Sequence, residues 1–265
     1  MTPFIKAEKS TDQNPNPSMY AMHTHDTYEI FCFLSGNAKY FVEGNVYPLK
    51  SGDILIMKKA EAHSLLIKTS QMYERIVISF SGDAIDDSLK DNLTSFLDNR
   101  PLGVNNRYAA SVFKEKNWLY YLNKICETED LNIQSLYLNV LLSELCESSN
   151  ELSDNTAARD DIMEILSYIN RHLSDLLTLE KICNRFYISK SQINKKFKKV
   201  IGTTVWEYIT AKRLLLAKDL LQKGNSPTSI YQKCGFRDYC TFFRAYKAKF
   251  AVSPKRDYNG YIKSK

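Results

Sequence analysis

Apolar and polar residues alternate along the first 80 residues of the chain, in short runs separated by turn residues. The runs are YEIFCFLSG, NAKYFVEGN, VYPLKSGD, ILIMKK, SLLIK and YERIVISF. Gly36, the Gly44-Asn45 pair and the Gly52-Asp53 pair mark the reversals between them. Alternation broken by glycine and asparagine is typical of short antiparallel strands. The pattern therefore predicts a compact antiparallel β-barrel over about residues 1–83.

The apolar period becomes helical from about residue 84. Two stripes follow the spacing i, i+3, i+4, i+7: Trp118, Tyr121, Leu122 and Ile125, and then Leu138, Leu141, Leu142 and Leu145. This spacing predicts two amphipathic helices within residues 112–147. The helices could cover the barrel or pair with a second chain. We expect a homodimer whose contact includes one of the two stripes.

The segment ESSNELSDNTAARDD, residues 147–161, is polar and has no apolar period. Such a composition is typical of a linker between domains. We therefore predict an α+β chain with two domains, residues 1–150 and 161–265, joined by a linker at residues 151–160. The second domain is predicted to be entirely helical.

Helix start signals in the second domain are unusually clear. Thr178 precedes a short helix that carries Leu179 and Ile182. After a turn, Ser189 and Gln192 form a capping-box pattern, which predicts a second helix from Lys190 to near Gly202. A short helix, a turn and a capped helix make a helix-turn-helix unit.

The same plan recurs at an offset of 49 residues, so that Ser189 corresponds to Asp238, Phe197 to Tyr246 and Gly202 to Ala251. Between the two units, the Thr204-x-x-Glu207 capping box opens a long helix that ends at about Lys223. This helix would act as a rigid spacer. Two recognition helices held about 34 Å apart could enter successive major-groove segments of one duplex.

The net charge of +6 is unevenly distributed along the chain. Residues 161–265 hold 21 of the 36 Lys and Arg residues but only 8 of the 30 Asp and Glu residues. A concentration of cations is expected of a domain that binds phosphates, although a solvated basic face gives the same composition. The six cysteines are scattered and include no C-x-x-C pair, so neither a disulfide framework nor a zinc ribbon is predicted.

A resemblance to the DNA-binding domain of the AraC/XylS family of bacterial transcription regulators is carried by two segments, LTLEKICNRFYISKSQINKKFKKVIGTTVWEYITAKRLLLAKDLL and SIYQKCGFRDYCTFFRAYKAKFAVSP. Its most specific parts are Ile188-Ser189, Phe197-Lys198-Lys199 to Gly202, Arg213-Leu214, Gly235-Phe236, Phe243 and Ser253-Pro254. The chain departs from the family pattern where Cys183 and Tyr231 replace an alanine, where Ala251 replaces a glycine, and where an arginine is displaced to Arg256.

The resemblance implies which residues contact DNA. The first unit would do so through Ser191, Asn194 and Lys195, and Lys190 and Lys199 are expected on the same outward face of the helix. The second unit would do so through Tyr239, Cys240, Thr241 and Arg244. Double-stranded DNA and RNA polymerase are the macromolecular partners that this family implies.

Three of the four histidines lie in the predicted barrel. The pattern His23-x-His25-x-x-x-Glu29 with Gly36 resembles the first cupin motif, and Gly52-Asp53 with His63 resembles the second. In cupins this set of three imidazoles and one carboxylate holds a divalent transition metal. Sensory domains of the regulator family resemble cupins and often bind only a small organic effector. Both alternatives remain open, as does a purely structural role.

The effector reading assigns the pocket to His23, His25, Tyr28, Glu29 and His63, with no metal. The metal reading uses His23, His25, Glu29 and His63. Three classes of function are compatible with parts of the chain: a ligand-responsive transcription regulator, a metal-dependent cupin enzyme with a helical appendage, and a DNA-compacting protein. Only the first accounts for both domains. We therefore predict a cytoplasmic, non-enzymatic regulator without membrane contact, controlled by a small polar effector such as a carbohydrate.

Overall fold

The computed structural model describes residues 3–15, 20, 22–23, 25–59, 61–67, 72–101, 103–149, 152, 161–201 and 203–263. The chain divides into two compact units, Met1–Ala158 and Arg159–Lys265. The predicted linker, residues 151–160, lies outside the described residues apart from Leu152.

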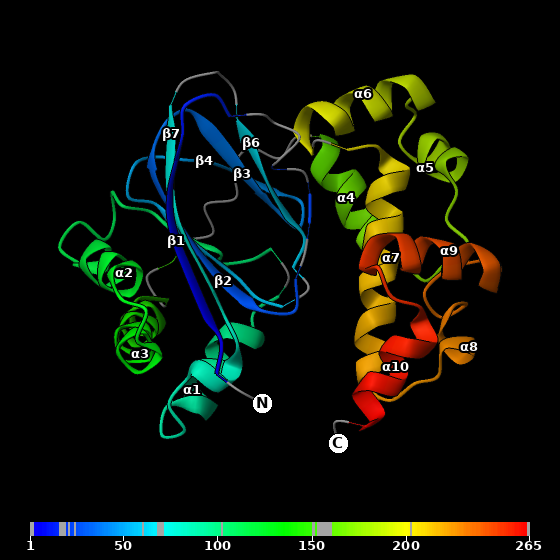
Figure 1. The fold of residues 1–265 in the computed structure, drawn as a ribbon. Helices are drawn as coiled ribbons and strands as arrows, with labels where there is room; N and C mark the ends of the chain where they lie inside the picture. Colours follow the sequence, from blue (N-terminus) through cyan, green and yellow to red (C-terminus); the bar gives the residue numbers. More distant parts are fainter. Residues whose placement is uncertain are drawn as a thin grey trace. The chain divides into compact units, whose positions relative to one another are not determined.

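The first unit contains eight described strands, all paired antiparallel (Figure 1). They are β1 (Ile5–Asp12), β2 (Tyr28–Ser35), β3 (Ala38–Val42), β4 (Asn45–Pro48), β5 (Ile54–Met57), β6 (His63–Ile67), β7 (Tyr73–Phe80) and β8 (Arg107–Tyr108). One sheet has the order β1-β7-β2-β5-β8, and the other has the order β4-β3-β6. The predicted antiparallel fold class is confirmed, but the described strands form two sheets rather than one closed barrel.

The turns lie close to the predicted positions. Gly36 and Gly52 both have positive φ, which a side chain would disfavour. The turn between β3 and β4 is centred on Glu43 and Gly44, one residue earlier than the predicted Gly44-Asn45 pair. Because both residues have positive φ, this is a tight hairpin turn whose twist matches that of the strands.

Strand β2 separates two apolar clusters because successive side chains point to opposite faces. Tyr28, Ile30 and Cys32 pack in the cluster that the helices cover. Phe31 and Phe33 pack in a second cluster with residues of the three-stranded sheet. The second cluster therefore fills the space between the two sheets. Glu29 lies on the face of β2 that points into this space.

The described part of the first unit contains the α-helices α1 (Lys90–Asp98), α2 (Trp118–Glu127) and α3 (Leu131–Ser148). Both predicted helical stripes pack against the five-stranded sheet of the same unit, with most of their side chains buried. These stripes are therefore not available to a second chain, and the prediction that one of them forms a dimer contact is wrong. The outer face of α3 instead exposes Ile133, Leu136 and Val140.

The described residues of the second unit form helices and no strands, as predicted. Its helices are α4 (Asp161–Arg171), α5 (Leu179–Arg185), α6 (Lys190–Val200), α7 (Val205–Gln222), α8 (Pro227–Ile230), α9 (Tyr239–Phe250) and α10 (Pro254–Lys263). Within this unit the long helix α7 connects the α5–α6 pair, which lies near one of its ends, to the α8–α9 pair (Figure 1). None of the described helices is long and apolar enough to cross a membrane.

The caps of these helices follow the sequence signals. Thr178 accepts from the backbone N–H of Lys181, and Ser189 and Gln192 form the complete capping box. Thr204 and Glu207 form a second complete box at the start of α7, and Asp238 caps α9. The repeat predicted Phe197 and Tyr246 as equivalent positions, and both side chains are fully buried. Gly202, the third predicted position of the first unit, lies outside the described residues.

Candidate functional site

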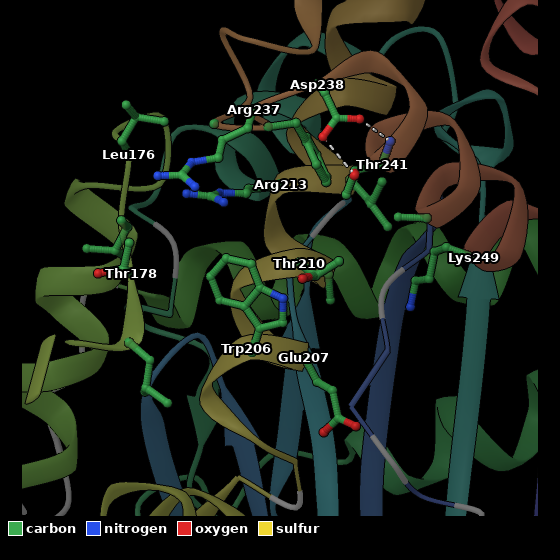
Figure 2. A pocket seen from close by; sticks show the side chains of 17 residues that line it. Leu176, Thr178, Trp206, Glu207, Thr210, Arg213, Arg237, Asp238, Thr241 and Lys249 are labelled. Atoms are coloured by element: carbon green, nitrogen blue, oxygen red, sulfur yellow. Dashed lines mark hydrogen bonds between the residues drawn. The ribbon is translucent and has the colours of Figure 1, made fainter. Parts of the chain in front are cut away.

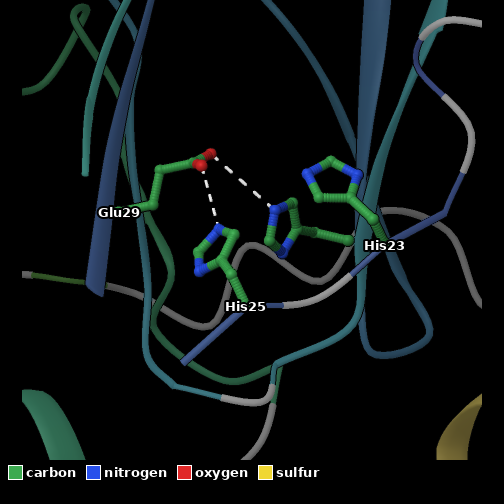
Figure 3. Close-up of side chains that lie close together, drawn as sticks. His23, His25 and Glu29 are labelled. Carbon is green, nitrogen blue, oxygen red and sulfur yellow. Dashed lines mark hydrogen bonds and ion pairs between the residues drawn. The ribbon is translucent and has the colours of Figure 1, made fainter. Parts of the chain in front are cut away.

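Four side chains predicted from the sequence come together at one end of the space between the two sheets. One ligand atom each from His23, His25, Glu29 and His63 lies within 4.8 Å of all the others. We call this set the histidine cluster. The Glu29 carboxylate points toward the imidazole rings, with His23 on the far side of the group (Figure 3).

The histidine cluster joins three separate parts of the first unit. Glu29 lies on β2 of the five-stranded sheet, and His63 is the first residue of β6 in the three-stranded sheet. His23 and His25 belong to the segment before β2. The backbone N–H of His23 donates to the His63 carbonyl over 3.0 Å, and the His63 N–H donates back over 3.1 Å. This pair of bonds holds His23 beside His63.

His63 presents an unpaired nitrogen to the cluster. Its Nδ1 lies 2.8 Å from the carbonyl oxygen of Glu61. Since a carbonyl can only accept, Nδ1 carries the proton and Nε2 carries a lone pair in the neutral ring. In the described part of the chain, Nε2 is buried without a hydrogen-bond partner, and it lies 3.8 Å from Glu29 Oε1. Burial lowers the pKa of His63 to about 4, so the ring stays neutral near pH 7.

The carbonyl that orients His63 is itself fixed by a buried ion pair. The Glu61 carboxylate is fully buried and lies 2.6 Å from Arg100 Nη2. It also accepts from the backbone N–H of Gly103 and from the side chain of Asn106. Glu61 is therefore a positioning residue, because its carboxylate anchors the loop whose backbone sets the tautomer of His63.

Glu29 is an ionised carboxylate in a largely buried position. Burial opposes its ionisation, but the hydrogen bond with His25 and the charge of the neighbouring imidazoles lower the pKa of Glu29 to about 2. His25 Nε2 lies 3.0 Å from Glu29 Oε2. Burial likewise opposes protonation of His25, but Glu29 outweighs it and raises the pKa of His25. The hydroxyl of Tyr40 donates to Glu29 Oε1 over 3.1 Å.

The donor set also fits a metal ion. Imidazole nitrogens and carboxylate oxygens bind Zn²⁺ at about 2.0–2.2 Å, so donor atoms around one ion are about 3–3.5 Å apart. A set that spans 4.8 Å needs only small side-chain rotations to reach that spacing, and His23 and His25 are not buried. Three nitrogens and one oxygen suit divalent first-row transition metals rather than Ca²⁺ or Mg²⁺.

Tyr28 does not belong to the histidine cluster. It neighbours Glu29 in the sequence and therefore points to the opposite face of β2. Its ring packs in the helix-covered cluster, and its hydroxyl donates to Asp98 Oδ2 of α1 over 2.9 Å. The prediction that Tyr28 lines the effector pocket is wrong.

The sequence analysis missed polar and aromatic residues that extend the site between the sheets. Tyr40 stacks on His63 with ring centroids 6.0 Å apart, in addition to its bond with Glu29. The guanidinium of Arg75 lies over the rings of Tyr20 and Tyr73, at 5.0 and 5.2 Å from their centroids. The alternation along β3 and β7 was the available signal, because it separates Tyr40 and Tyr73 from the outward residues.

Helix α6 exposes most of the residues predicted to contact DNA. Ser191, Lys195 and Lys199 are exposed, and Lys190 forms an exposed ion pair with Glu180. Asn194 has a structural role as well: its Oδ1 accepts from the backbone N–H of Val205 at the start of α7, and its Nδ2 donates to the Lys190 carbonyl. A base contact by Asn194 would compete with these bonds.

Helix α9 presents a second cationic face. Cys240, Thr241 and Arg244 are exposed, whereas Tyr239 is half-buried and packs edge-on against Tyr231. The Thr241 hydroxyl donates to Asp238 Oδ2 over 2.8 Å. Cys240 and Arg244 are therefore the predicted contact residues on α9 whose side chains are exposed and form no hydrogen bond among the described residues.

Two capped helix-turn-helix units joined to a sheet-rich unit with a polar cluster define a class of two-domain, ligand-responsive DNA-binding proteins. Residues 8–112 match the family model described as an AraC-like ligand binding domain, and residues 182–258 match that of a helix-turn-helix domain. The chain belongs to the AraC family of transcription regulators.

Several known proteins are similar to most of the chain. The chain is 24% identical to the HTH-type transcriptional activator RhaS of Yersinia pestis bv. Antiqua (strain Angola), over 90% of this chain and 89% of that protein. It is 20% identical to the HTH-type transcriptional activator RhaR of Mannheimia succiniciproducens, over 98% and 93% of the two chains. Among solved structures, ToxT of Vibrio cholerae is 18% identical, covering 96% of this chain and 98% of its own, with a TM-score of 0.39.

Proposed function

We propose that the histidine cluster binds a small polar effector, and that this binding controls transcription through the two helix-turn-helix units. In this proposal residues 1–150 form the sensory and dimerisation domain, and residues 161–265 form the DNA-binding domain. The effector contacts His23, His25, Glu29 and His63. Lys190, Ser191, Asn194, Lys195 and Lys199 contact one DNA segment, and Cys240, Thr241 and Arg244, together with Tyr239, contact the next.

One observation carries the proposal for the sensor. His63 Nε2 is a buried hydrogen-bond acceptor with no partner among the described residues, next to an ionised carboxylate. An unsatisfied buried polar atom is costly, and a ligand that donates to it recovers that cost. The nearby donors and acceptors and the ring of Tyr40 favour a ligand with several hydroxyl groups, of which a carbohydrate is one class.

The proposal assigns the histidine cluster to recognition and not to catalysis, in line with relatives that are transcription regulators. Because those relatives are named activators, we propose that the chain activates transcription, with RNA polymerase as a further partner in the cytoplasm.

We also propose a homodimer. Its contact would use the exposed apolar face of α2 and α3, which consists of Leu119, Tyr120, Ile133, Leu136 and Val140.

A screen of polar metabolites by thermal unfolding of the full-length protein tests the sensor. A ligand that binds only the folded state raises the unfolding temperature by mass action. We expect at least one polyhydroxylated compound to raise it, and to change DNA affinity measured by fluorescence anisotropy. The response should vanish in His63→Gln and persist in His172→Gln, since His172 lies in the second unit. A response that His63→Gln retains would place the effector elsewhere.

A metal ion at the same cluster is the second candidate. The observation that favours it is the pair of electron donors, His63 Nε2 and Glu29 Oε1, which face each other with no proton between them. The ion would be held by His23, His25, Glu29 and His63, and would supply a Lewis-acidic contact for a polar effector. His63 already meets one requirement of such a site, because a carbonyl orients its second nitrogen.

A further inference from the structure

The second unit contains a cavity of about 690 Å³ between its two helix-turn-helix units (Figure 2). Its walls come from the start of α5, one side of α7, the turn before α9, and α9 itself. Leu176, Trp206, Leu214 and Phe236 make these walls mainly apolar. A cavity of this size with apolar walls and a few polar groups has the dimensions of a small-molecule site.

The apolar wall of the cavity is incompletely covered. Leu176 and Trp206 are each at least half exposed to solvent. Large apolar side chains that gather around a concave surface mark a binding site more often than scattered ones do. The indole of Trp206 offers a flat apolar surface to an occupant.

The charged residues around the cavity are unbalanced. Among the described residues, no carboxylate forms an ion pair with Arg213, Arg237 or Lys249. Both carboxylates at the cavity are already engaged as helix caps. Glu207 accepts from Thr203 and Thr204, and Asp238 accepts from Thr241. The cavity therefore has excess positive charge, and an anionic group is its complement.

The floor of the cavity is rigid at its cationic end. Arg213 is buried, and its guanidinium donates to the carbonyls of Leu173 and Asp175, each over 2.9 Å. Gly235 packs directly on this guanidinium, because a Cβ at that position would lie 2.7 Å from Arg213 Nε. The charge of Arg213 is therefore held in place before any ligand binds.

We propose that this cavity binds a small amphipathic anion, with an aromatic or similarly apolar body against Trp206, Leu214 and Phe236, and an acidic group near Arg213 and Arg237. The site goes beyond the proposed effector site, since it lies wholly within the second unit. Its walls include Thr178 at the start of α5, and Asp238 and Thr241 at the start of α9. An occupant therefore contacts both helix-turn-helix units and constrains their relative orientation.

The probe for this site is 8-anilinonaphthalene-1-sulfonate, which combines aromatic rings with one negative charge. The full-length protein is titrated with it while energy transfer from tryptophan is recorded. The chain has two tryptophans, Trp118 in the first unit and Trp206 at the cavity. We expect saturable binding of one equivalent per chain, and loss of most of the energy transfer in Trp206→Phe, a variant that keeps an apolar wall.

Two further variants test separately the positive charge at the cavity and the open volume of the cavity. Arg237→Gln removes an exposed cation and should weaken binding at least about 5-fold, which corresponds to about 1 kcal/mol. Ala245→Phe places a ring in the cavity and should abolish the saturable phase. Lys247→Gln is the control. It removes a cation of α9 that does not line the cavity, and it should leave probe binding unchanged.

The uncharged analogue N-phenyl-1-naphthylamine tests the need for an anion, and we expect it to bind at least about 10-fold more weakly. Equal binding of the two compounds overturns the anionic part of the proposal. Saturable binding that neither Arg237→Gln nor Ala245→Phe reduces overturns the site itself. If Arg237→Gln weakens DNA binding but leaves probe binding intact, Arg237 is a DNA phosphate contact and the proposal fails. None of these outcomes depends on the histidine cluster, so the proposed effector site is tested separately.

Discussion

His63 Nε2 and Glu29 Oε1 lie 3.8 Å apart, and neither atom has a proton to offer the other. A lone pair and a negative charge in a buried position attract a hydrogen-bond donor or a cation. This relationship supports the proposal that the histidine cluster binds a ligand. A cation and an organic effector can be distinguished, because only a cation such as Co²⁺ gives the absorption bands of a ligated metal.

The metal alternative predicts stoichiometric binding. Metal-free full-length protein titrated with Co²⁺ should take up one equivalent and develop visible absorption bands of the nitrogen- and oxygen-ligated ion. His63→Gln and Glu29→Gln should each reduce the affinity at least about 10-fold, because each removes a ligand. His172→Gln is the matched control and should bind like the unchanged chain. If no Co²⁺ binds at micromolar concentration, the cluster recognises an organic ligand only.

DNA binding should depend on α6 and α9 in different ways. Arg244→Ala should relax preference at one base pair, since a base contact contributes about 1–3 kcal/mol of discrimination. Lys199→Ala should weaken binding to all sequences about equally and reduce the salt dependence by about one phosphate. Titrations of operator and unrelated duplexes at several salt concentrations distinguish the two effects. A uniform loss in Arg244→Ala reassigns that residue to the phosphate backbone.

Self-association should depend on the outer face of α3. Leu136 is 65% exposed there, in line with Ile133 and Val140. Leu136→Asp should convert a dimer to a monomer in sedimentation at micromolar concentration, because a charge in an apolar contact is strongly unfavourable. Val112→Asp is the control, since Val112 is an exposed apolar residue outside α2 and α3. A wild-type chain that sediments as a monomer contradicts the dimer outright.

Ala251 ends α9 in the left-handed conformation, with φ at 59°. Glycine adopts this conformation without strain, whereas a Cβ disfavours it. Ala251→Gly should therefore raise the free energy of unfolding of the second unit by about 1 kcal/mol, with Ala248→Gly, inside the same helix, destabilising by a similar amount. Urea titrations of the three proteins compare them directly, and a destabilised Ala251→Gly would contradict the argument.

The stability of the fold at acid pH should depend on the Glu207 carboxylate, which caps α7. Bonds from Thr203 and Thr204 lower the pKa of Glu207 to about 2. Since the folded-state pKa lies below the unfolded value, this carboxylate stabilises the fold above about pH 4.5, and the stabilisation is lost as the pH falls toward 2. In Glu207→Gln, the free energy of unfolding should therefore decrease less between these pH values than it does in the unchanged chain. Denaturant titrations at pH 6, 4 and 3 follow the difference, and parallel curves for the two proteins exclude it.

Local signals gave most of the fold. Ser189, Thr204 and Asp238 predicted helix starts because capping is decided by a few neighbouring residues. Strand β1 was missed because IKAEKSTD carries polar residues on both faces, and its pairing partner β7 lies far along the chain. Helix α10 was missed because its sequence is largely polar, although Pro254 is a helix-start signal.

The sequence predicted the four residues of the histidine cluster, but it did not predict the side chains that surround them. His23, His25, Glu29 and His63 were found through a motif that fixes their spacing. Tyr28 was wrongly included because the motif took precedence over the two-residue period of a strand, which separates Tyr28 from Glu29. Alternation along β3 and β7 predicts only which side chains point inward, and pairing between distant strands brings Tyr40 and Arg75 to the site.

Glu29 and His63 are the only residues of the histidine cluster that lie within strands, and each belongs to a different sheet. Any molecule bound to both is a cross-link between the sheets, and its binding energy opposes their separation. A ligand that fills the cluster should therefore slow the exchange of the amide hydrogens of β2 and β6 with solvent. In the proposed sensor, ligand binding would change the stiffness of the domain while the mean positions of its strands stay the same.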